Sequence, residues 1–158
     1  MKATHDVIDI PYIEIRDEKA AGTAGGGFTS GVWQTRTLNT EHADTGSHAS
    51  VASNQITLAA GTYEVDITCP AAVVGTHQAM LYNVTDSATT LIGHSAQTAT
   101  GSTVITHARI TGRFTIASQK VFEIRHRCTT TKATDGMGIA ANFGETEIYT
   151  VARFWKVA

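Results

Sequence analysis

The sequence predicts an all-β protein, and two observations carry this prediction. Apolar residues recur at every second position in many separate segments, which is the period of a strand with one buried face. No segment keeps a helical period for three turns. The alternating segments are short, they number eight to ten, and polar turns separate them, so the pattern favours a two-sheet sandwich.

The expected strands follow one another along the whole chain. The clearest lies at 62–69, where apolar and polar residues alternate, and we expect Pro70 to end it. Its expected core face consists of Tyr63, Val65, Ile67 and Cys69. The last, at 147–157, is partly apolar on both faces, as expected of a strand that packs on the core and on a neighbouring subunit. The others lie at 11–16, 31–38, 50–58, 77–86, 89–95, 108–117, 120–128 and 137–143.

Two of these strands, at 108–117 and 120–128, are separated by a short polar turn and are expected to pair with each other. Gly112 interrupts the core face of the first strand. A glycine in a strand interior predicts either a bulge or a close crossing by another part of the chain.

The second strand of this pair contains "RHRC" at 125–128, a cluster of chemically active side chains. A metal site or a thiol nucleophile would need further ligands or a general base beside His126 and Cys128, which share the predicted core face. We therefore favour packed interior positions for these two, with Arg125 and Arg127 on the opposite face. The expected partners of the arginines are carboxylates of neighbouring strands or subunits, such as Glu123, Glu145 and Glu147.

Neither the cysteines nor the histidines have the spacing of a metal site. Cys69 and Cys128 are far apart in sequence, and burial as free thiols is favoured over a disulfide, which stays open. The seven histidines have no ligand spacing along one strand, so no metal is expected. One exception stays open, namely an ion on a threefold axis that binds one histidine from each subunit.

Composition and motifs exclude several classes of function. The charged fraction is 16 % and the net charge is -2, so we expect neither nucleic acid nor an anionic membrane as a partner. No apolar run has the length of a membrane span or of a secretory signal, so we expect a soluble protein that is made in the cytoplasm and does not insert into membranes. No acid pair, catalytic triad or nucleotide-binding loop is legible, and we expect no enzymatic activity and no cofactor.

The segment "AAGTAGGG" at 20–27 has the composition of a flexible linker. It predicts a division of the chain into an N-terminal arm with its linker at 1–27 and a β-sandwich domain at 28–158. We expect the arm to be an anchor.

Four blocks of the chain together resemble a domain that recurs in bacteriophage fibre and spike proteins. They are "GGGFTSGVWQTRTLNTE", "NQITLAAGTYEVDITCPA", "MLYNVTDSATTLIG" and "GRFTIASQKVFEIRHRCTTTKATDGMGIAANFGETEIYTVARFWKV", which occur in the right order over about residues 25–157. In layout this domain is similar to the jelly rolls of tumour necrosis factor and of the complement globular heads, which form trimers. The resemblance implies a jelly-roll β-sandwich, a homotrimer, and a place in the virion, assembled in the host cytoplasm.

These expectations define two sets of candidate site residues. In a trimer one sheet faces the symmetry axis, and rows of charged and aromatic side chains there would fix the register between subunits. The expected interface residues are Glu123, Arg125, Arg127, Tyr149, Val151, Arg153 and Trp155. Exposed loops on a rigid β-scaffold often carry contacts with other molecules. The expected surface-contact residues are His42, Asp44, His48, Lys132 and Asp135.

The function that follows is a trimeric fibre-tip or spike subunit that attaches the virion to a host-surface glycan or protein, with its N-terminal arm on other virion proteins. One alternative is a capsid decoration trimer whose arm binds the shell. Another is a carbohydrate-binding or glycan-cleaving tip, in which Trp33 or another aromatic residue would stack on a sugar.

Overall fold

The computed structural model describes residues 8–158 and confirms the all-β prediction. These residues form no helix, and hence none that could cross a membrane. The strands are β1 (Tyr12–Lys19), β2 (Gln34–Thr35), β3 (Thr40–Asp44), β4 (Ala49–Ala52), β5 (Gln55–Leu58), β6 (Gly61–Ala72), β7 (Thr76–Asn83), β8 (Ala88–Ile92), β9 (Ala96–Gln97), β10 (Ile105–Ile116), β11 (Lys120–Cys128) and β12 (Glu147–Lys156).

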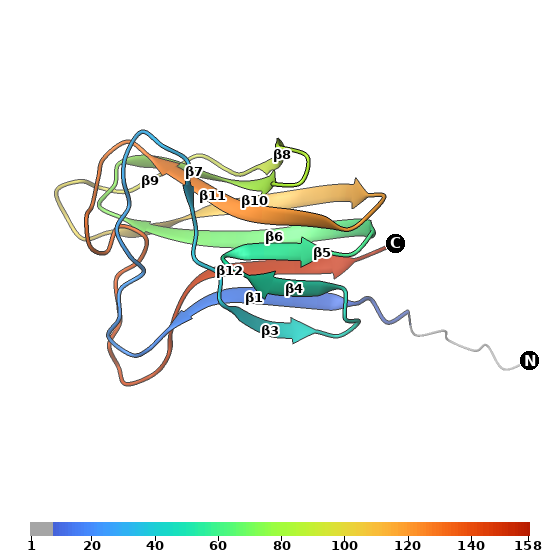
Figure 1. Ribbon diagram of the computed structural model, residues 1–158. Coiled ribbons are helices and arrows are strands. Elements are labelled where there is room, and N and C mark those ends of the chain that lie inside the picture. The colour runs from blue at the N-terminus through green and yellow to red at the C-terminus, as the bar shows by residue number, and fades with distance from the viewer. Residues whose placement is uncertain (1–7) are drawn as a thin grey trace, which may run out of the picture.

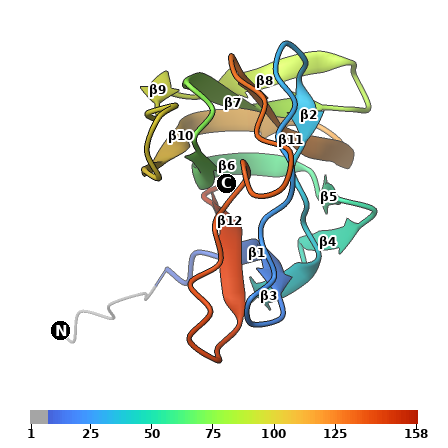
Figure 2. The same cartoon turned by 90° about the vertical axis from the view of Figure 1, so that its left-hand side faces the viewer.

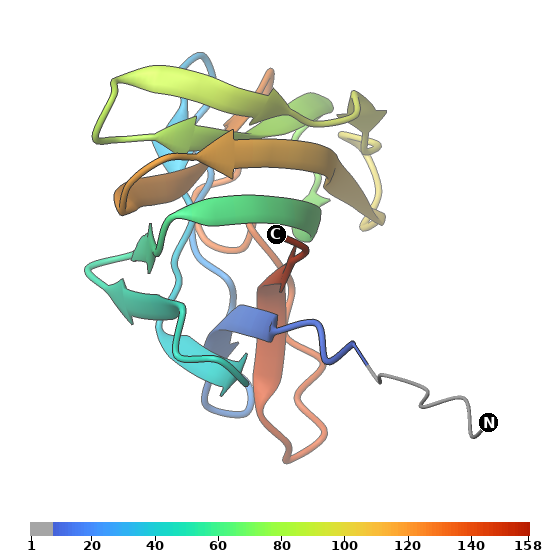
Figure 3. The same cartoon turned by 90° about the vertical axis from the view of Figure 1, so that its right-hand side faces the viewer.

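The strands form two antiparallel sheets that pack face to face as a jelly roll (Figure 1). The five-stranded sheet has the order β10-β6-β12-β1-β3. The seven-stranded sheet has the order β4-β5-β11-β7-β8, with β2 on β11 and β9 on β7. From β5 onward the chain passes repeatedly from one sheet to the other. Figure 2 views the end that carries the long loops, and Figure 3 views the opposite end, where the C-terminus lies.

The core lies between the sheets and follows the predicted alternation. In β6 the predicted core face is enclosed, because Tyr63, Ile67 and Cys69 are fully buried and Val65 is nearly so. The other large side chains of this core include Ile13, Ile15, Ile56, Leu58, Leu81, Phe122, Ile124 and Phe154. Each fully buried side chain of this size contributes roughly 1.5–3 kcal/mol. Burial of the two inner faces therefore holds the sheets together.

Gly112 is the site of a close crossing and not of a bulge. The register between β10 and β6 runs without a shift past Gly112, which pairs with Val65. Gly112 has a φ of +154°, and a Cβ atom there would lie 3.0 Å from Leu91 Cδ2 of β8. The absence of a side chain allows Leu91 to cross directly over β10.

We expect Gly112→Ala to lower the free energy of unfolding by about 1–2 kcal/mol, because the new methyl group collides with Leu91 and the backbone conformation disfavours a side chain. Urea unfolding of the wild type and the variant measures this. The double variant Gly112→Ala/Leu91→Ala should be more stable than the sum of the two single losses predicts. Purely additive losses would contradict the crossing.

Pro70 does not end β6, contrary to expectation. The strand continues to Ala72, and Pro70 pairs with His107 of β10. On its other side β6 pairs with β12 only as far as Thr68. Pro70 therefore lies where β6 has only one neighbour, an edge-like position that tolerates a residue without a backbone N–H.

The expected boundary at residue 27 is wrong for the described residues of the arm. β1 lies inside the five-stranded sheet, between β12 and β3. The glycine-rich segment after it is bound to the loop before β12, since Gly25 N–H donates to Gly138 O at 2.8 Å and Phe28 N–H donates to Lys132 O at 2.8 Å. A Cβ atom at Gly25 would lie 2.7 Å from Met137 O, so glycine is needed for this approach. The first part of the expected anchor, residues 1–7, lies outside the described residues.

The strands at 108–117 and 120–128 do not pair with each other as expected, because β10 belongs to the five-stranded sheet and β11 to the seven-stranded sheet. The segment 50–58 is not one strand, because β4 and β5 pair with each other across a turn at 53–54.

Three further expectations about the elements also need correction. The segment 137–143 is a loop and not a strand, because Asn142 has a φ of +55°. Of 31–38 only Gln34–Thr35 pairs as a strand. Conversely, the segment 39–50, which carries the expected loop residues His42, Asp44 and His48, contains β3, whose polar sequence suits the edge of a sheet.

Candidate functional site

The outward face of the five-stranded sheet carries an ordered array of polar and aromatic side chains. Alternate residues of β1, β6, β10 and β12 point into the core, so the residues between them point outward. The register places these outward residues in three rows across the sheet. We call them the charged face: Tyr12, Trp155, Glu64 and Arg113 in the first row, Glu14, Arg153, Asp66 and Thr111 in the second, and Arg16, Val151, Thr68 and Arg109 in the third.

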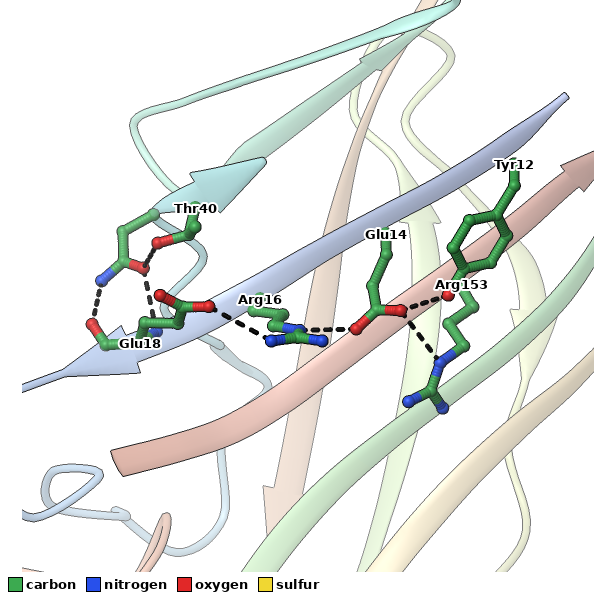
Figure 4. Close-up of polar contacts among 7 residues, drawn as sticks. Tyr12, Glu14, Arg16, Glu18, Thr40 and Arg153 are labelled. Atoms are coloured by element: carbon green, nitrogen blue, oxygen red, sulfur yellow. Dashed lines mark hydrogen bonds and ion pairs between the residues drawn. The ribbon is translucent and has the colours of Figure 1, made fainter. Parts of the chain in front are cut away.

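Glu14 is the centre of a hydrogen-bond network on this face (Figure 4). Its carboxylate accepts from the Tyr12 hydroxyl, from Arg16 Nε at 2.5 Å and from Arg153 Nε at 3.3 Å. Arg16 Nη1 also donates to Glu18 Oε1 at 3.4 Å. These neighbours cover Glu14, which is only 5 % exposed although it points away from the core. The network therefore links β1 to β12 on their outward side.

The electrostatics of Glu14 follow from this enclosure. Burial opposes its charge, but the hydrogen bonds from Tyr12 and Arg16 and the charges of Arg16 and Arg153 outweigh burial and lower the pKa of Glu14. Burial and the adjacent carboxylate raise the pKa of Tyr12. At neutral pH Glu14 is therefore charged and Tyr12 is protonated. Such a carboxylate holds side chains in position and has no proton to give to a substrate near neutral pH.

A second group of ion pairs extends the charged face over β6 and β10. Arg109 donates two parallel hydrogen bonds to the Asp66 carboxylate, of 3.0 Å from Nε and 2.9 Å from Nη2. Arg113 Nε donates to Glu64 Oε1 at 2.7 Å. Exposed pairs of this kind contribute only about 0–1 kcal/mol each to stability. Their regular arrangement matters more, because it presents both signs of charge at fixed positions.

The charges of this surface balance. Its four cations are Arg16, Arg109, Arg113 and Arg153. The four anions in contact with them are Glu14, Glu64 and Asp66 of the same face and Glu18 beside it on β1. A surface with equal numbers of both charges is a poor match for a polyanion. It does offer complementary groups to a second copy of itself.

Exposed apolar side chains gather at one end of the same sheet. Phe143, in the loop before β12, is 89 % exposed, and Ile148 and Ile105 are 46 % and 41 % exposed. A shallow groove of about 190 Å³ there is lined partly by Ile105, Ile139 and Ile148. Exposed apolar groups beside a patterned polar surface are typical of a protein–protein interface.

The expected interface residues fall into two groups on different sheets. Val151, Arg153 and Trp155 belong to the charged face, where the Trp155 ring lies 5.5 Å from that of Tyr12. Tyr149 is only 6 % exposed, and its hydroxyl donates to Thr23 O at 2.7 Å, so it has little surface to offer a partner.

The other group, Glu123, Arg125 and Arg127, lies on the outward face of the seven-stranded sheet. Arg125 Nε donates to Glu123 Oε2 at 3.0 Å, and the Arg125 guanidinium lies 3.5 Å from the centre of the Tyr82 ring. Arg127 is exposed. Because the two groups are on opposite sides of the sandwich, they do not form one surface. An interface role for either group stays a prediction.

The expected surface-contact residues also lie apart. Lys132 and Asp135 form an ion pair of 3.4 Å in the loop before β12. This loop is at the left of Figure 1. Asp44 is at the other end of the sandwich and holds the turn after β3, accepting from the backbone N–H of His48 at 3.0 Å and of Ala49 at 2.8 Å. His42 is on β3. These residues therefore make no single contact surface in one chain.

His126 and Cys128 of the "RHRC" cluster are buried as expected. His126 is fully buried, Cys128 is 3 % exposed, and both cysteines are free. Burial raises the pKa of Cys128, and it raises that of Cys69 to about 11, so neither side chain is a ready thiolate nucleophile. Glu147 does not pair with an arginine, because its carboxylate accepts from the backbone N–H of Asn142 at 2.7 Å and of Ala141 at 3.0 Å.

Sequence reasoning missed the partner of His126. His77 Nδ1 lies 2.9 Å from His126 Nε2, and His77 Nε2 lies 2.8 Å from Thr106 Oγ1. Both rings are enclosed, and His126 Nδ1 has no hydrogen-bond partner. The alternation of β7, which places His77 on the same face as Ala79 and Leu81, could have indicated its burial.

Stability should fall as the pH drops from about 6.5 toward 4, because these histidines resist protonation in the folded state. Burial lowers the pKa of His77 to about 4 and that of His126 well below its usual value, with Arg36 adding to both shifts. The unfolded chain therefore binds more protons below pH 6.5. We expect each histidine to lower the free energy of unfolding by about 2 kcal/mol as the pH falls from 7 to 5.

Urea unfolding at several pH values measures this loss. His126→Phe keeps a ring of similar size and removes one titrating group, so its stability should change about half as steeply with pH over this range. Equal stability of the wild type at pH 7 and pH 5 would contradict the assignment of two neutral buried histidines.

A second buried group, Arg36, was also missed. It is fully buried at the loop end of the core and donates from Nε to Thr150 Oγ1 at 2.8 Å, from Nη1 to Pro70 O at 3.1 Å and from Nη2 to Met137 O at 2.8 Å. Burial lowers the pKa of Arg36, although the negative charge of Asp17 opposes this. The sequence offered one signal of this burial, because in the predicted strand at 31–38 Arg36 shares a face with the apolar Leu38.

Among the described residues, no three side chains of His, Cys, Asp or Glu gather into a group that could hold a metal ion. A metal shared between subunits on a symmetry axis stays a prediction. On the five-stranded sheet, the histidine for this prediction is His107, which lies on the outward side of β10 opposite Pro70.

Comparison with known proteins identifies the fold. The crystal structure of murine APRIL at pH 5.0 has a TM-score of 0.61 and 7 % identity, with 94 % of this chain and 100 % of that chain covered. The globular domain of the zebrafish complement 1qA protein has a TM-score of 0.56 and 11 % identity, with 94 % and 98 % covered. At such identities the likeness establishes a jelly roll similar to those of the tumour necrosis factor and complement globular-head proteins. No protein-family model and no curated protein matches the sequence.

Proposed function

We propose that this chain is a non-enzymatic binding protein that acts as a homotrimer and attaches a bacteriophage virion to its host, at a fibre tip or a projecting spike. The charged face carries the assembly part of this proposal. It combines ion pairs fixed by hydrogen bonds with the partly exposed Trp155. The exposed side chains of Phe143, Ile148 and Ile105 lie beside it, at one end of the same sheet.

A closed ring of copies can be built on the charged face. Because this face holds both signs of charge, Arg113 or Arg109 of one chain can meet carboxylates of the next chain when the copies are related by rotation about an axis. The groove lined by Ile105 and Ile148 can receive apolar groups of the neighbouring chain. The resemblance to trimer-forming jelly rolls supports three copies.

The virion part of the proposal is supported by the sequence resemblance to fibre and spike domains. In a trimer built on the five-stranded sheet, the seven-stranded sheet and the loops stay on the outside, where they can meet a host surface. The proposed contact with other virion proteins is made by the N-terminal segment before β1.

Immunogold electron microscopy with antibodies against this chain tests the virion part. Particles of the phage that encodes it should carry label at fibre tips or at tail spikes. Label over the capsid shell, together with tight binding of the purified protein to empty capsids, would favour the decoration alternative over attachment. Particles without label would overturn a virion role altogether.

A further inference from the structure

A pocket on the seven-stranded sheet is separate from the charged face. Its volume is about 320 Å³, at the lower end of the range for small-molecule sites. It lies where β7 begins and β11 ends, between the loop before β2 and the start of β9. The lining residues used below are Trp33, Thr76, Gln78, Ser95, Arg127 and Thr129.

Arg127 places an unpaired cation at this pocket. Each of the other six arginines donates to a carboxylate, a carbonyl or a hydroxyl. Arg127 has no ion-pair or hydrogen-bond partner among the described residues, although Arg125 on the same face is paired. A free guanidinium binds a carboxylate through two parallel hydrogen bonds, which a neutral group of the same size cannot reproduce.

The remaining lining groups match a sugar. Trp33 is partly exposed at the pocket and offers an aromatic surface of the kind that packs on the apolar side of a sugar ring. Gln78 lies opposite Arg127 in the register, and its amide nitrogen is held by Gly93 O at 2.8 Å, which leaves the amide oxygen to accept from a sugar hydroxyl. Ser95, Thr76 and Thr129 add hydroxyl groups that both donate and accept.

We propose that this pocket binds the uronic acid class of sugars, with the carboxylate on Arg127 and the sugar ring against Trp33. The inference rests on the proposed attachment role for its biological meaning and names the ligand class for that role. Its physical basis is independent of assembly, because the pocket and the charged face are on opposite sheets. In the proposed trimer the pocket stays open to solvent.

Glucuronate and glucose form a matched pair of probes, because they differ only at C6, which is a carboxylate in glucuronate and a hydroxymethyl group in glucose. Titration calorimetry with the full chain should show that glucuronate binds at least about tenfold more tightly than glucose. Arg127→Gln should reduce glucuronate affinity at least tenfold, to the level of glucose, and Trp33→Ala should weaken both sugars. Lys120→Gln removes the same charge from the far end of β11 and should change neither.

Three outcomes would overturn the proposal: equal affinities for the two sugars, an Arg127→Gln variant that keeps the preference for glucuronate, or no binding of either sugar at millimolar concentrations. The molar mass of the same samples in solution separates this proposal from the one on assembly. A trimer that ignores both sugars refutes the pocket alone. A monomer that binds glucuronate through Arg127 refutes the assembly alone.

Discussion

Arg36→Ala should lower the free energy of unfolding by about 4 kcal/mol, a large fraction of the stability of a domain of this size. The arginine is fully buried and donates to Thr150 Oγ1, Pro70 O and Met137 O. Truncation leaves these buried acceptors unpaired and opens a cavity where the side chain was. Because the acceptors belong to β12, β6 and the loop before β12, the loss should loosen that whole end of the sandwich.

Two comparisons keep this result specific. Arg127→Ala removes an exposed, unpaired arginine and should change stability by no more than about 0.5 kcal/mol. Arg36→Lys keeps the charge but cannot supply donors to all three acceptors, and should remain well below the wild type in stability. Denaturant unfolding at pH 7 measures each variant. A loss below 1 kcal/mol for Arg36→Ala would show that the buried guanidinium does not hold these segments together.

Val151→Glu should convert the assembled protein into single chains. Val151 is a partly exposed residue of the charged face, in the strand between β1 and β6. Its neighbours across the register are Arg16 and Thr68. Arg16 already donates to Glu14 and Glu18. In a tightly packed interface a new carboxylate at position 151 would therefore be buried in excess of the cations beside it, and every copy in the assembly would carry this penalty.

Val121→Glu is the matched control for this experiment. Val121 is also a partly exposed strand valine, but it lies in β11 of the seven-stranded sheet. The substitution should leave the assembly intact. Circular dichroism of both variants establishes that the fold survives. If Val121→Glu dissociates the protein and Val151→Glu does not, the interface is on the seven-stranded sheet and the assignment to the charged face is wrong.

The strand periodicity was sufficient to predict the sandwich and most of its core. Strands such as β6 have apolar residues at alternate positions because one side of the sheet faces the core, and this alternation can be recognised in the sequence. Edge strands escape this rule, and the polar sequence of β3 does not predict a strand. The apolar residues at 137–143 do predict a strand, but the segment is a loop in which only the first two residues are buried.

The candidate site could be predicted only in part, for a physical reason. Alternation shows which residues of one strand share a side, and it correctly grouped Val151, Arg153 and Trp155. It does not show which sheet a strand joins, so residues of β11 were combined with residues of β12 although the two strands belong to different sheets. The network around Glu14 depends on the pairing of β1 with β12, residues that are far apart in sequence.

The buried polar groups were the hardest to foresee. Arg36 and His77 lie at core-facing positions, where charged and titratable residues are rare unless they are hydrogen-bonded. Their partners include backbone carbonyls of distant segments and a second histidine, which no local pattern specifies.

Sedimentation of the purified chain at micromolar concentration tests the central claim most directly. One chain has a mass of 16.8 kDa, so three copies have a mass of about 50 kDa. Self-association through the charged face predicts the larger species for the wild type and for Val121→Glu, and the smaller one for Val151→Glu. A wild-type protein that sediments as a single compact species of 16.8 kDa would contradict the claim.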